Sequence, residues 1–495
     1  MKYLFCILLS VFVVISCNNT TYLIGTNDSS VDAHSFEEKE DTENDEQSAL
    51  LNVKVEQNEK NVLSCRLTFN TQESKKISVR YFSKDHKGYE ITEENETTDH
   101  YFFLWGMRAE REYKIEIYEG ENFETPIATT QFKTGSLPPA TPGMYLAINE
   151  KEKVADGFTL FTFSATIEEK AVPLALMVDT DGEVVWYFEY YMNGFNILGD
   201  LSYIEKSESI LIGLTKAPNM SEIPAEEAIE IDLEGNVLWK SRPFPNVYGD
   251  EHSWHHTYQL LEDDTIVFLR SEFIGPLISD KIVNVNRDYD ELWGWRYLDH
   301  LEQPFCTGPD WCDWTHSNTV IMLKNENTTY LNSRNMSSLF KIDMESGEIL
   351  WTFGRDGGFV LSSDIEHPWF EYAHAPKIAG NKILFYDNGT FDRGFSRVIE
   401  YEVDFENLKA ETTFSYDGSE DGGMWFSEYW GDADYLPNGN ILVTAGIYDL
   451  SGYSRIFEIT KEGEKVWDFF MQKEETWMYS LYNSQKFVPP LKTLD

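Results

Sequence analysis

A repeat that ends in tryptophan constrains the fold of this chain more than any other feature. Each copy has the form apolar, acidic, turn, glycine, two apolar residues and Trp, as in residues 178–186. The tryptophans of the first four copies are 53, 54 and 58 residues apart, and the last gap of 116 is twice 58. A degenerate stretch at 401–414 fills that gap, which makes six units. The other copies lie at 231–239, 285–293, 342–351 and 459–467.

Units of more than 50 residues with four strands each are typical of propeller blades, since the repeats of solenoids are shorter. We therefore expect an all-β chain in which residues 144–495 form a six-bladed β-propeller. The repeated Trp should fill the space between blades rather than contact a ligand, because a large ring in such a position contributes mainly by packing.

A second pattern precedes the repeats. Residues 51–136 alternate apolar and polar side chains with a period of two, which predicts short half-buried strands in a small immunoglobulin-like or fibronectin-like β-sandwich. Cys65 lies on the apolar face of one such strand, so we expect a buried thiol. Residues 134–143 are rich in Pro and Gly and mark the boundary to the propeller.

The amino terminus has the features of an export signal. Lys2 is followed by an apolar run over residues 4–15, and the tetrapeptide that ends at Cys17 resembles the bacterial lipobox. That resemblance implies removal of residues 1–16 and acylation of Cys17; an ordinary signal peptide or a membrane anchor is the alternative. Residues 17–50 are polar and acidic and predict a solvated tether. We expect a lipid-anchored membrane protein of the bacterial envelope that faces the periplasm or the cell surface.

Charge limits the possible partners. The chain has 85 Asp and Glu against 40 Lys and Arg, a formal net charge of −45, and no basic stripe compensates locally. Such a surface repels phosphate backbones, so nucleic acid is excluded as a partner.

Histidines gather where a propeller would place its chemistry. The first strand of each blade lines the central channel, and aligning these strands from their following turns puts His256, Asn318 and His374 at equal depth. A period of two then places His316 on the same face as Asn318. His255 would face the other way unless a bulge precedes its strand, so we favour His256 for the channel. The histidines near predicted inner strands are His252, His255, His256, His316 and His374.

Four segments of the repeat region carry a resemblance to a known family. They are the histidine pair at 255–256, Asp-Trp-Thr-His-Ser-Asn at 313–318, Leu-Asn-Ser-Arg at 331–334 leading into 339–343, and His374 followed by Leu-Phe-Tyr-Asp-Asn-Gly at 384–389. Together they resemble the bacterial arylsulfate sulfotransferases. The resemblance implies a six-bladed propeller after a small β-sandwich, and transfer of a sulfuryl group from an aryl sulfate to a phenol through a sulfated histidine. It implies no nucleotide donor, no cofactor and no metal.

The resemblance also implies roles for single residues. His374 would be the nucleophile, with His256, His316, Arg334 and Asn318 around the sulfuryl oxygens. These residue types suit the chemistry, because a loose transition state with charge on its oxygens needs hydrogen-bond donors and a planar guanidinium. His255 is the further candidate for substrate binding, and several aromatic side chains could stack on the aryl ring. Those aromatic candidates are Trp254, Trp314, Tyr372, Trp425 and Trp430.

Cys306 and Cys312 enclose a short loop just before His316. In an exported protein we expect them to form a disulfide, since Gly308 and Pro309 permit the turn.

Three other functions stay open. The histidines could form a zinc or copper centre, although Arg334 in the same channel argues against a metal. The propeller could bind a ligand at the cell surface without catalysis, or the chain could be a hydrolase that transfers the sulfuryl group to water.

Overall fold

The computed structural model consists of β-strands and turns, with no α-helix among the residues it describes. These residues are 50–167, 170–190, 195–217, 225–241, 254–304, 312–420, 422–446, 453–472 and 481–494. The all-β expectation is therefore confirmed. The predicted leader, Cys17 and nearly all of the acidic tether lie outside the described residues. Within the described ranges, no helix is long and apolar enough to cross a membrane.

Two sheets built from residues 50–133 form the amino-terminal part of one compact unit that spans residues 49–495. The first contains β1 (Leu50–Gln57), β2 (Cys65–Lys75) and β5 (Thr97–Leu104). The second contains β3 (Ile77–Phe82), β4 (Tyr89–Thr92), β6 (Glu112–Glu119) and β7 (Ala128–Lys133). Alternate residues of β2 are buried, and Cys65 is a buried free thiol, as its position on the apolar face predicts.

Six antiparallel sheets follow in the described part of the chain, and each contains one copy of the repeat. The first sheet contains β9 (Phe158–Ile167), β10 (Lys170–Val178) and β11 (Val184–Glu189). The second contains β12 (Phe195–Ile204), β13 (Ser209–Ala217), β14 (Ala225–Asp232) and β15 (Val237–Lys240). The third sheet contains β16 (Trp254–Leu260), β17 (Ile266–Ile274), β18 (Leu277–Val285) and β19 (Glu291–Arg296). The fourth contains β21 (Ser317–Leu323), β22 (Thr328–Ser333), β23 (Ser338–Asp343) and β24 (Ile349–Gly354). The fifth sheet contains β26 (His374–Ala379), β27 (Lys382–Asp387), β28 (Arg397–Asp404) and β29 (Lys409–Tyr416). The sixth contains β30 (Asp432–Tyr435), β31 (Ile441–Ala445), β32 (Tyr453–Ile459) and β33 (Lys465–Gln472).

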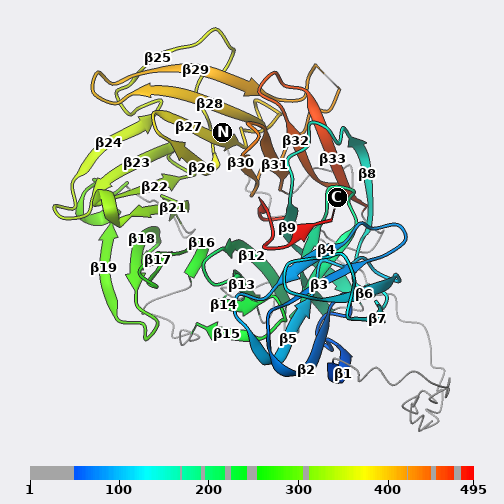
Figure 1. Cartoon of the computed structure of the whole chain (residues 1–495). Helices are drawn as coiled ribbons and strands as arrows, with labels where there is room; N and C mark the ends of the chain where they lie inside the picture. Colours follow the sequence, from blue (N-terminus) through cyan, green and yellow to red (C-terminus); the bar gives the residue numbers. More distant parts are fainter. Residues whose placement is uncertain are drawn as a thin grey trace, which may run out of the picture. The chain divides into compact units, whose positions relative to one another are not determined.

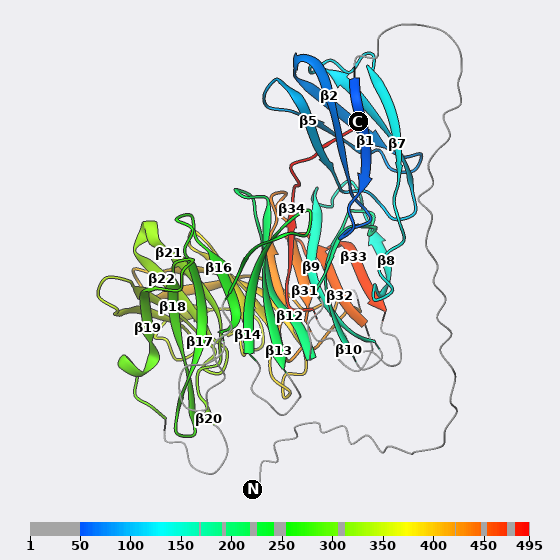
Figure 2. The same cartoon turned by 90° about the horizontal axis from the view of Figure 1, so that it is seen from below.

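Short strands complete the edges of several sheets. β34 (Ser484–Phe487) pairs with β9, and β8 (Gly143–Asn149) pairs with β33, so both ends of this region join sheets distant in sequence. From β34 the chain returns to the amino-terminal sheets, where β35 (Lys492–Thr493) pairs with β4 (Figure 2). Two parallel additions are β20 (Cys312–Asp313) on β18 and β25 (Val360–Ser362) on β29.

The six sheets are arranged in chain order around a common centre, with β12, β16, β21, β26 and β30 toward the centre and β15, β19, β24 and β29 toward the rim (Figure 1). The inner strands of different sheets therefore converge.

The repeated tryptophans link each sheet to the next. Their indole N–H groups donate to backbone carbonyls in the outer turn of the following sheet, and the last sheet is linked in this way to the first. The bonds run from Trp186 to Leu233, Trp239 to Arg287, Trp293 to Met344 and Trp467 to Thr180, over 2.8, 3.4, 2.9 and 3.0 Å.

The two remaining sheets make the same link by other contacts. The ring of Trp351 stacks on Phe405, in the outer turn of the fifth sheet, with ring centroids 5.0 Å apart. In the degenerate copy Phe414 replaces Trp, and Lys461 of the sixth sheet lies over its ring, 5.4 Å from the centroid. The expectation that the repeated Trp is structural is confirmed, because its position spans two sheets in every copy.

We predict that Trp467→Leu lowers the free energy of unfolding by about 3 kcal/mol, because the substitution opens a cavity around a fully buried ring and removes the hydrogen bond to Thr180. The partly exposed Trp239 is the matched control, and its Leu variant should lose about 1 kcal/mol. Denaturant unfolding followed by tryptophan fluorescence measures both. Equal losses would contradict the role of Trp467 in joining the last sheet to the first.

Candidate functional site

Four histidines meet where the inner strands converge. The ring of His256 lies with its centroid 5.3 Å from that of His316 and 6.3 Å from that of His374. His255 packs edge-on against His256 at 5.0 Å. The structure thus brings together four of the predicted histidines from three sheets; His252 lies outside the described residues.

Backbone irregularities position these rings. His256, His316 and Tyr372 have φ angles of 62°, 40° and 54°, in the left-handed region that residues with a Cβ seldom adopt. The ladder of the third sheet shifts register between His255 and Tyr258, and that of the fifth sheet shifts between His374 and Lys377. The bulge considered in the sequence analysis would precede the strand, whereas the shift in the third sheet lies within β16. His256 faces the other rings, and His255 lies behind it.

His374 is held in one orientation by an amide. Its Nδ1 atom lies 2.7 Å from Oδ1 of Asn388. The amide nitrogen of Asn388 donates to the carbonyls of Ser427 and Trp430, each over 2.8 Å, so its oxygen must face the histidine. Nδ1 of His374 therefore carries the proton, and the neutral ring has its lone pair on Nε2.

Burial keeps His374 neutral. Only 4% of the residue is exposed, and burial lowers its pKa to about 3 against the opposing effect of the Asn388 hydrogen bond. The positive potentials of Arg334 and His316 lower the pKa further. A neutral imidazole with an unshared Nε2 lone pair is a competent nucleophile near neutral pH.

Arg334 provides the positive charge. Its guanidinium carbon lies 4.6 Å from the ring centroid of Tyr372 and 5.4 Å from that of Tyr429. One terminal nitrogen donates to the Glu428 carbonyl over 3.3 Å, whereas Nε is buried and has no hydrogen-bond partner among the described residues. Burial lowers the pKa of Arg334, and its charge remains available to an anion.

His316 is partly accessible, with about a third of its side chain exposed. Its Nδ1 pairs with the carboxylate of Asp313, which directs Nε2 away from that carboxylate. The Arg334 amide donates to the His316 carbonyl over 3.2 Å, so the two residues are fixed to each other through the backbone.

Other predicted site residues have mainly structural contacts. The Asn318 amide is buried; it donates to the Ala373 carbonyl over 2.9 Å and accepts from Asn332 over 2.7 Å. Trp314 packs into a hydrophobic cluster with Tyr297, 6.1 Å between centroids.

Two of the remaining aromatic candidates, Trp425 and Trp430, also contact other aromatic side chains. Trp425 is buried and donates to the Tyr386 hydroxyl, whereas the Trp430 ring lies 5.8 Å from that of Tyr482. Among the five aromatic candidates, the Tyr372 ring is the one that lies against the Arg334 guanidinium in the described part of the chain. The Trp254 side chain lies outside the described residues.

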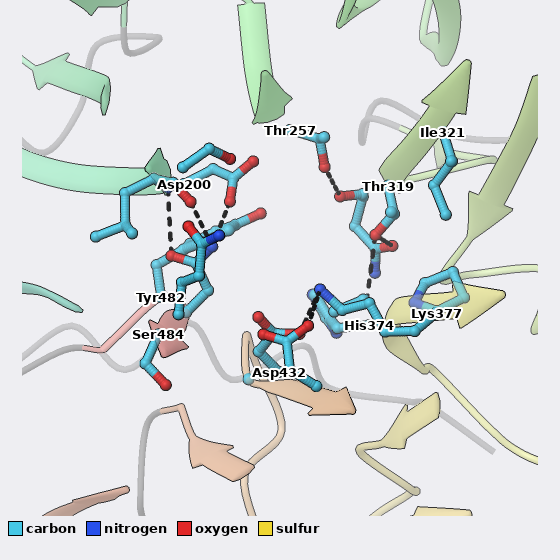
Figure 3. A pocket seen from close by; sticks show the side chains of 18 of the residues that line it. Asp200, Thr257, Thr319, Ile321, His374, Lys377, Asp432, Tyr482 and Ser484 are labelled. Carbon is cyan, nitrogen blue, oxygen red and sulfur yellow. Dashed lines mark hydrogen bonds and ion pairs between the residues drawn. The ribbon is translucent and has the colours of Figure 1, made fainter. Parts of the chain in front are cut away.

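His374 is one of the residues that line a cavity of about 330 Å³. Asp200 and Tyr482 lie across it from Thr319 and His374 (Figure 3). Lys377 is another lining residue, and the carboxylates of Asp432 and Asp434 hold it at 3.2 and 2.8 Å. A space of this volume is large enough for a small aromatic molecule.

Sequence reasoning missed two residues behind the rings. Asn388 belongs to the segment at 384–389, where an amide after a strand carried no specific signal for a role. Asp280 is buried within β18 and contacts His255; an acidic residue inside an apolar strand was the available signal.

Two predictions at this site are not tested by the described residues. Cys306 lies outside them, so the disulfide to Cys312 stays a prediction. In the described part of the chain no group of three or more His, Cys, Asp or Glu is arranged to hold a metal ion, and His252, one of the histidines considered for such a centre, lies outside it.

Comparison of the sequence with models of protein families finds a match. A family model described as arylsulfotransferase (ASST) matches residues 145–480, well over half of the chain. No curated protein matches the chain.

Three solved structures are distantly similar to the chain. A nidogen/laminin complex is 12% identical, covers 66% of this chain and 97% of that chain, and has a TM-score of 0.37. A protein from Lactobacillus plantarum is 10% identical, covers 84% of this chain and 100% of that chain, and has a TM-score of 0.37. A luciferin-regenerating enzyme is 7% identical, covers 71% of this chain and 100% of that chain, and has a TM-score of 0.33. Likenesses at these scores carry no argument about function.

We predict that His374 stays neutral down to about pH 5, where a histidine with the ordinary pKa of about 6.5 would be mostly protonated. Titration of ¹⁵N-histidine-labelled protein by NMR measures this, with the His374→Asn variant assigning the signal. The spectrum should show Nδ1 protonated and Nε2 unprotonated throughout. A midpoint near pH 6.5 would contradict the burial and the amide contact described above.

Proposed function

The chain belongs to the arylsulfotransferase family, and from this premise we propose that it transfers a sulfuryl group from an aryl sulfate to a phenol through a covalent intermediate on His374. The observation that carries the proposal is the protonation state of His374: a buried, neutral imidazole whose Nδ1 is fixed by Asn388, which leaves the lone pair on Nε2. The His256 ring lies 6.3 Å from that ring, and the positive potentials of Arg334 and His316 act on it.

In the first half-reaction, Nε2 of His374 attacks the sulfur of the aryl sulfate. The N–S bond forms as the bond to the phenolic oxygen breaks, and the aryl product leaves with the electron pair. Charge on the sulfuryl oxygens is stabilised by Arg334, and the N–H groups of His316 and His256 can donate to those oxygens or to the departing phenolate. Since the buried Nε of Arg334 has no partner among the residues that the structure describes, we assign this N–H group to a sulfuryl oxygen.

In the second half-reaction, a phenol takes the sulfuryl group from His374. The sulfated imidazole is cationic in its ring, which makes it a good leaving group, and Asn388 accepts the hydrogen bond from Nδ1 throughout. The cavity beside His374 gives an aromatic acceptor room to approach. No nucleotide donor takes part in this scheme.

We further propose that the six sheets are the blades of a β-propeller. The pairing of β34 with β9, the pairing of β8 with β33, and the bond from Trp467 to Thr180 support this architecture, because each links late residues to early ones. The proposed domains are a sandwich over residues 51–136 and a catalytic propeller over residues 144–495.

The proposed place of action is the bacterial envelope. The sequence before residue 50 supports a protein anchored by a lipid on Cys17, with an acidic tether between the membrane and the folded part. An oxidising compartment would also favour the proposed disulfide between Cys306 and Cys312, next to His316.

We predict a burst of phenol release from an aryl sulfate when no acceptor is present, with about one phenol released per chain, because His374 retains the sulfuryl group. A phenolic acceptor should then restore steady turnover with ping-pong kinetics. His374→Asn should fold normally and show no burst. Continuous release without acceptor would indicate a hydrolase, and a requirement for both substrates before any release would contradict the covalent intermediate.

We predict that Arg334→Lys lowers the rate of the burst about 10²-fold with little change in unfolding free energy. Lys retains a charge but loses the planar guanidinium between Tyr372 and Tyr429 and its spare N–H group. Stopped-flow measurement of phenol release gives the rate, and thermal unfolding is the control. A rate within twofold of the native one would place Arg334 outside the reaction.

A further inference from the structure

Asp280 is a buried carboxylate to which the proposed mechanism gives no role. Only 2% of the residue is exposed. One oxygen accepts hydrogen bonds from the Ser317 amide over 2.5 Å and from the Thr315 hydroxyl over 2.7 Å. The other oxygen lies 3.1 Å from Nε2 of His255.

These contacts keep Asp280 ionised. Burial by itself would raise the pKa of this carboxyl group, but His255 and the two hydrogen-bond donors outweigh burial and hold the pKa below its usual value. A buried carboxylate of this kind stabilises positive charge on the group that faces it, which here is the His255 ring.

His255 in turn contacts His256. Their Nδ1 atoms are 2.8 Å apart, a distance that requires one proton between them. Asp280, His255 and His256 therefore form a chain from the interior of the third sheet to the ring that faces His316 and His374.

The two ends of this chain differ in their tolerance of charge. Burial lowers the pKa of His256 well below its usual value, and the positive potentials of the other histidines and Arg334 lower it further. A proton that would make His256 cationic is therefore unfavourable there, whereas the same charge on His255 lies against the Asp280 carboxylate.

We propose that Asp280 and His255 store one proton behind His256, which His256 gives to the departing phenolate and takes back from the incoming phenol. This inference rests on the proposed function. His256 is then a catalytic acid and base, and Asp280 and His255 are positioning residues that act through it.

The protons balance in the donor half-reaction. At the start His255 is an imidazolium that faces Asp280 with Nε2–H and donates Nδ1–H to Nδ1 of His256. His256 gives its Nε2 proton to the phenolate oxygen as the S–O bond breaks, and the Nδ1 proton of His255 moves to His256. A neutral phenol leaves, both histidines are neutral, and the sulfated ring of His374 carries the positive charge.

The acceptor half-reaction reverses each transfer. The acceptor phenol gives its proton to Nε2 of His256, whose Nδ1 proton returns to His255. The phenolate oxygen forms a bond to sulfur, and the N–S bond breaks with its electron pair returning to His374. The stored proton is restored, so each cycle begins with the same charges.

A series of donors with leaving groups of different basicity tests this chain. A phenol near pKa 10, as for tyrosine, needs a proton as it leaves, whereas an activated nitrophenol several units more acidic does not. Asp280→Asn removes the charge with little change in shape. His255→Asn is a second variant that breaks the chain at another point. The measurement is the burst rate without acceptor for phenyl sulfate and for nitrophenyl sulfate.

Both variants should slow the burst with phenyl sulfate by about 10²-fold and the burst with nitrophenyl sulfate by less than about threefold. Retained activity with nitrophenyl sulfate also reports that the variant is folded. Thr315→Val is the matched control: it removes a hydroxyl from the same carboxylate but leaves the charge, so the ratio of the two rates should stay native.

Equal losses with both donors, or no loss with either, would overturn the proton store. Absence of any burst in the native protein would instead overturn the proposed function, so the two failures are distinguishable.

Discussion

The site depends on the contacts between each sheet and the outer turn of the next. The rings of Trp186, Trp293 and Trp467 extend from one sheet to a backbone carbonyl of its neighbour. Burial of the fully buried rings of Trp186 and Trp467 contributes several kcal/mol each, on the order of 3–5. Because His256 and His374 belong to different sheets, their ring separation of 6.3 Å depends on the spacing between those sheets. A repeat that is purely structural therefore sets the geometry in which chemistry takes place.

Within that geometry the environment assigns different states to neighbouring histidines. His374 is buried beside an amide oxygen that can only accept a hydrogen bond. Its ring is therefore neutral, with the proton on Nδ1 and the lone pair on Nε2. His255 faces the ionised Asp280, which favours a proton on its ring. Pairs of titratable groups whose surroundings separate their pKa values are the usual basis for assigning nucleophile, acid and base. In a chain with a net charge of −45, Arg334 also gives an anionic substrate a local positive charge.

The sequence predicted the parts of this arrangement that repeat and missed those that depend on local irregularity. Spacing of the tryptophans indicated six units, and alignment of inner strands brought together His256, His316 and His374. A period-two count assumes a regular strand, and the register shift between His255 and Tyr258 breaks that assumption. The role of Asn388 depends on two carbonyls of a distant loop, which no local pattern reveals.

The covalent intermediate on His374 is the central claim, and direct identification of the sulfated residue tests it most directly. The protein is mixed with an aryl sulfate alone, quenched within milliseconds at alkaline pH, where a sulfated imidazole is most stable, and digested for peptide mass spectrometry. The account predicts one added sulfuryl group on the peptide that contains His374, and none in the His374→Asn variant. Sulfate on another residue, or none on any peptide during phenol release, would contradict it.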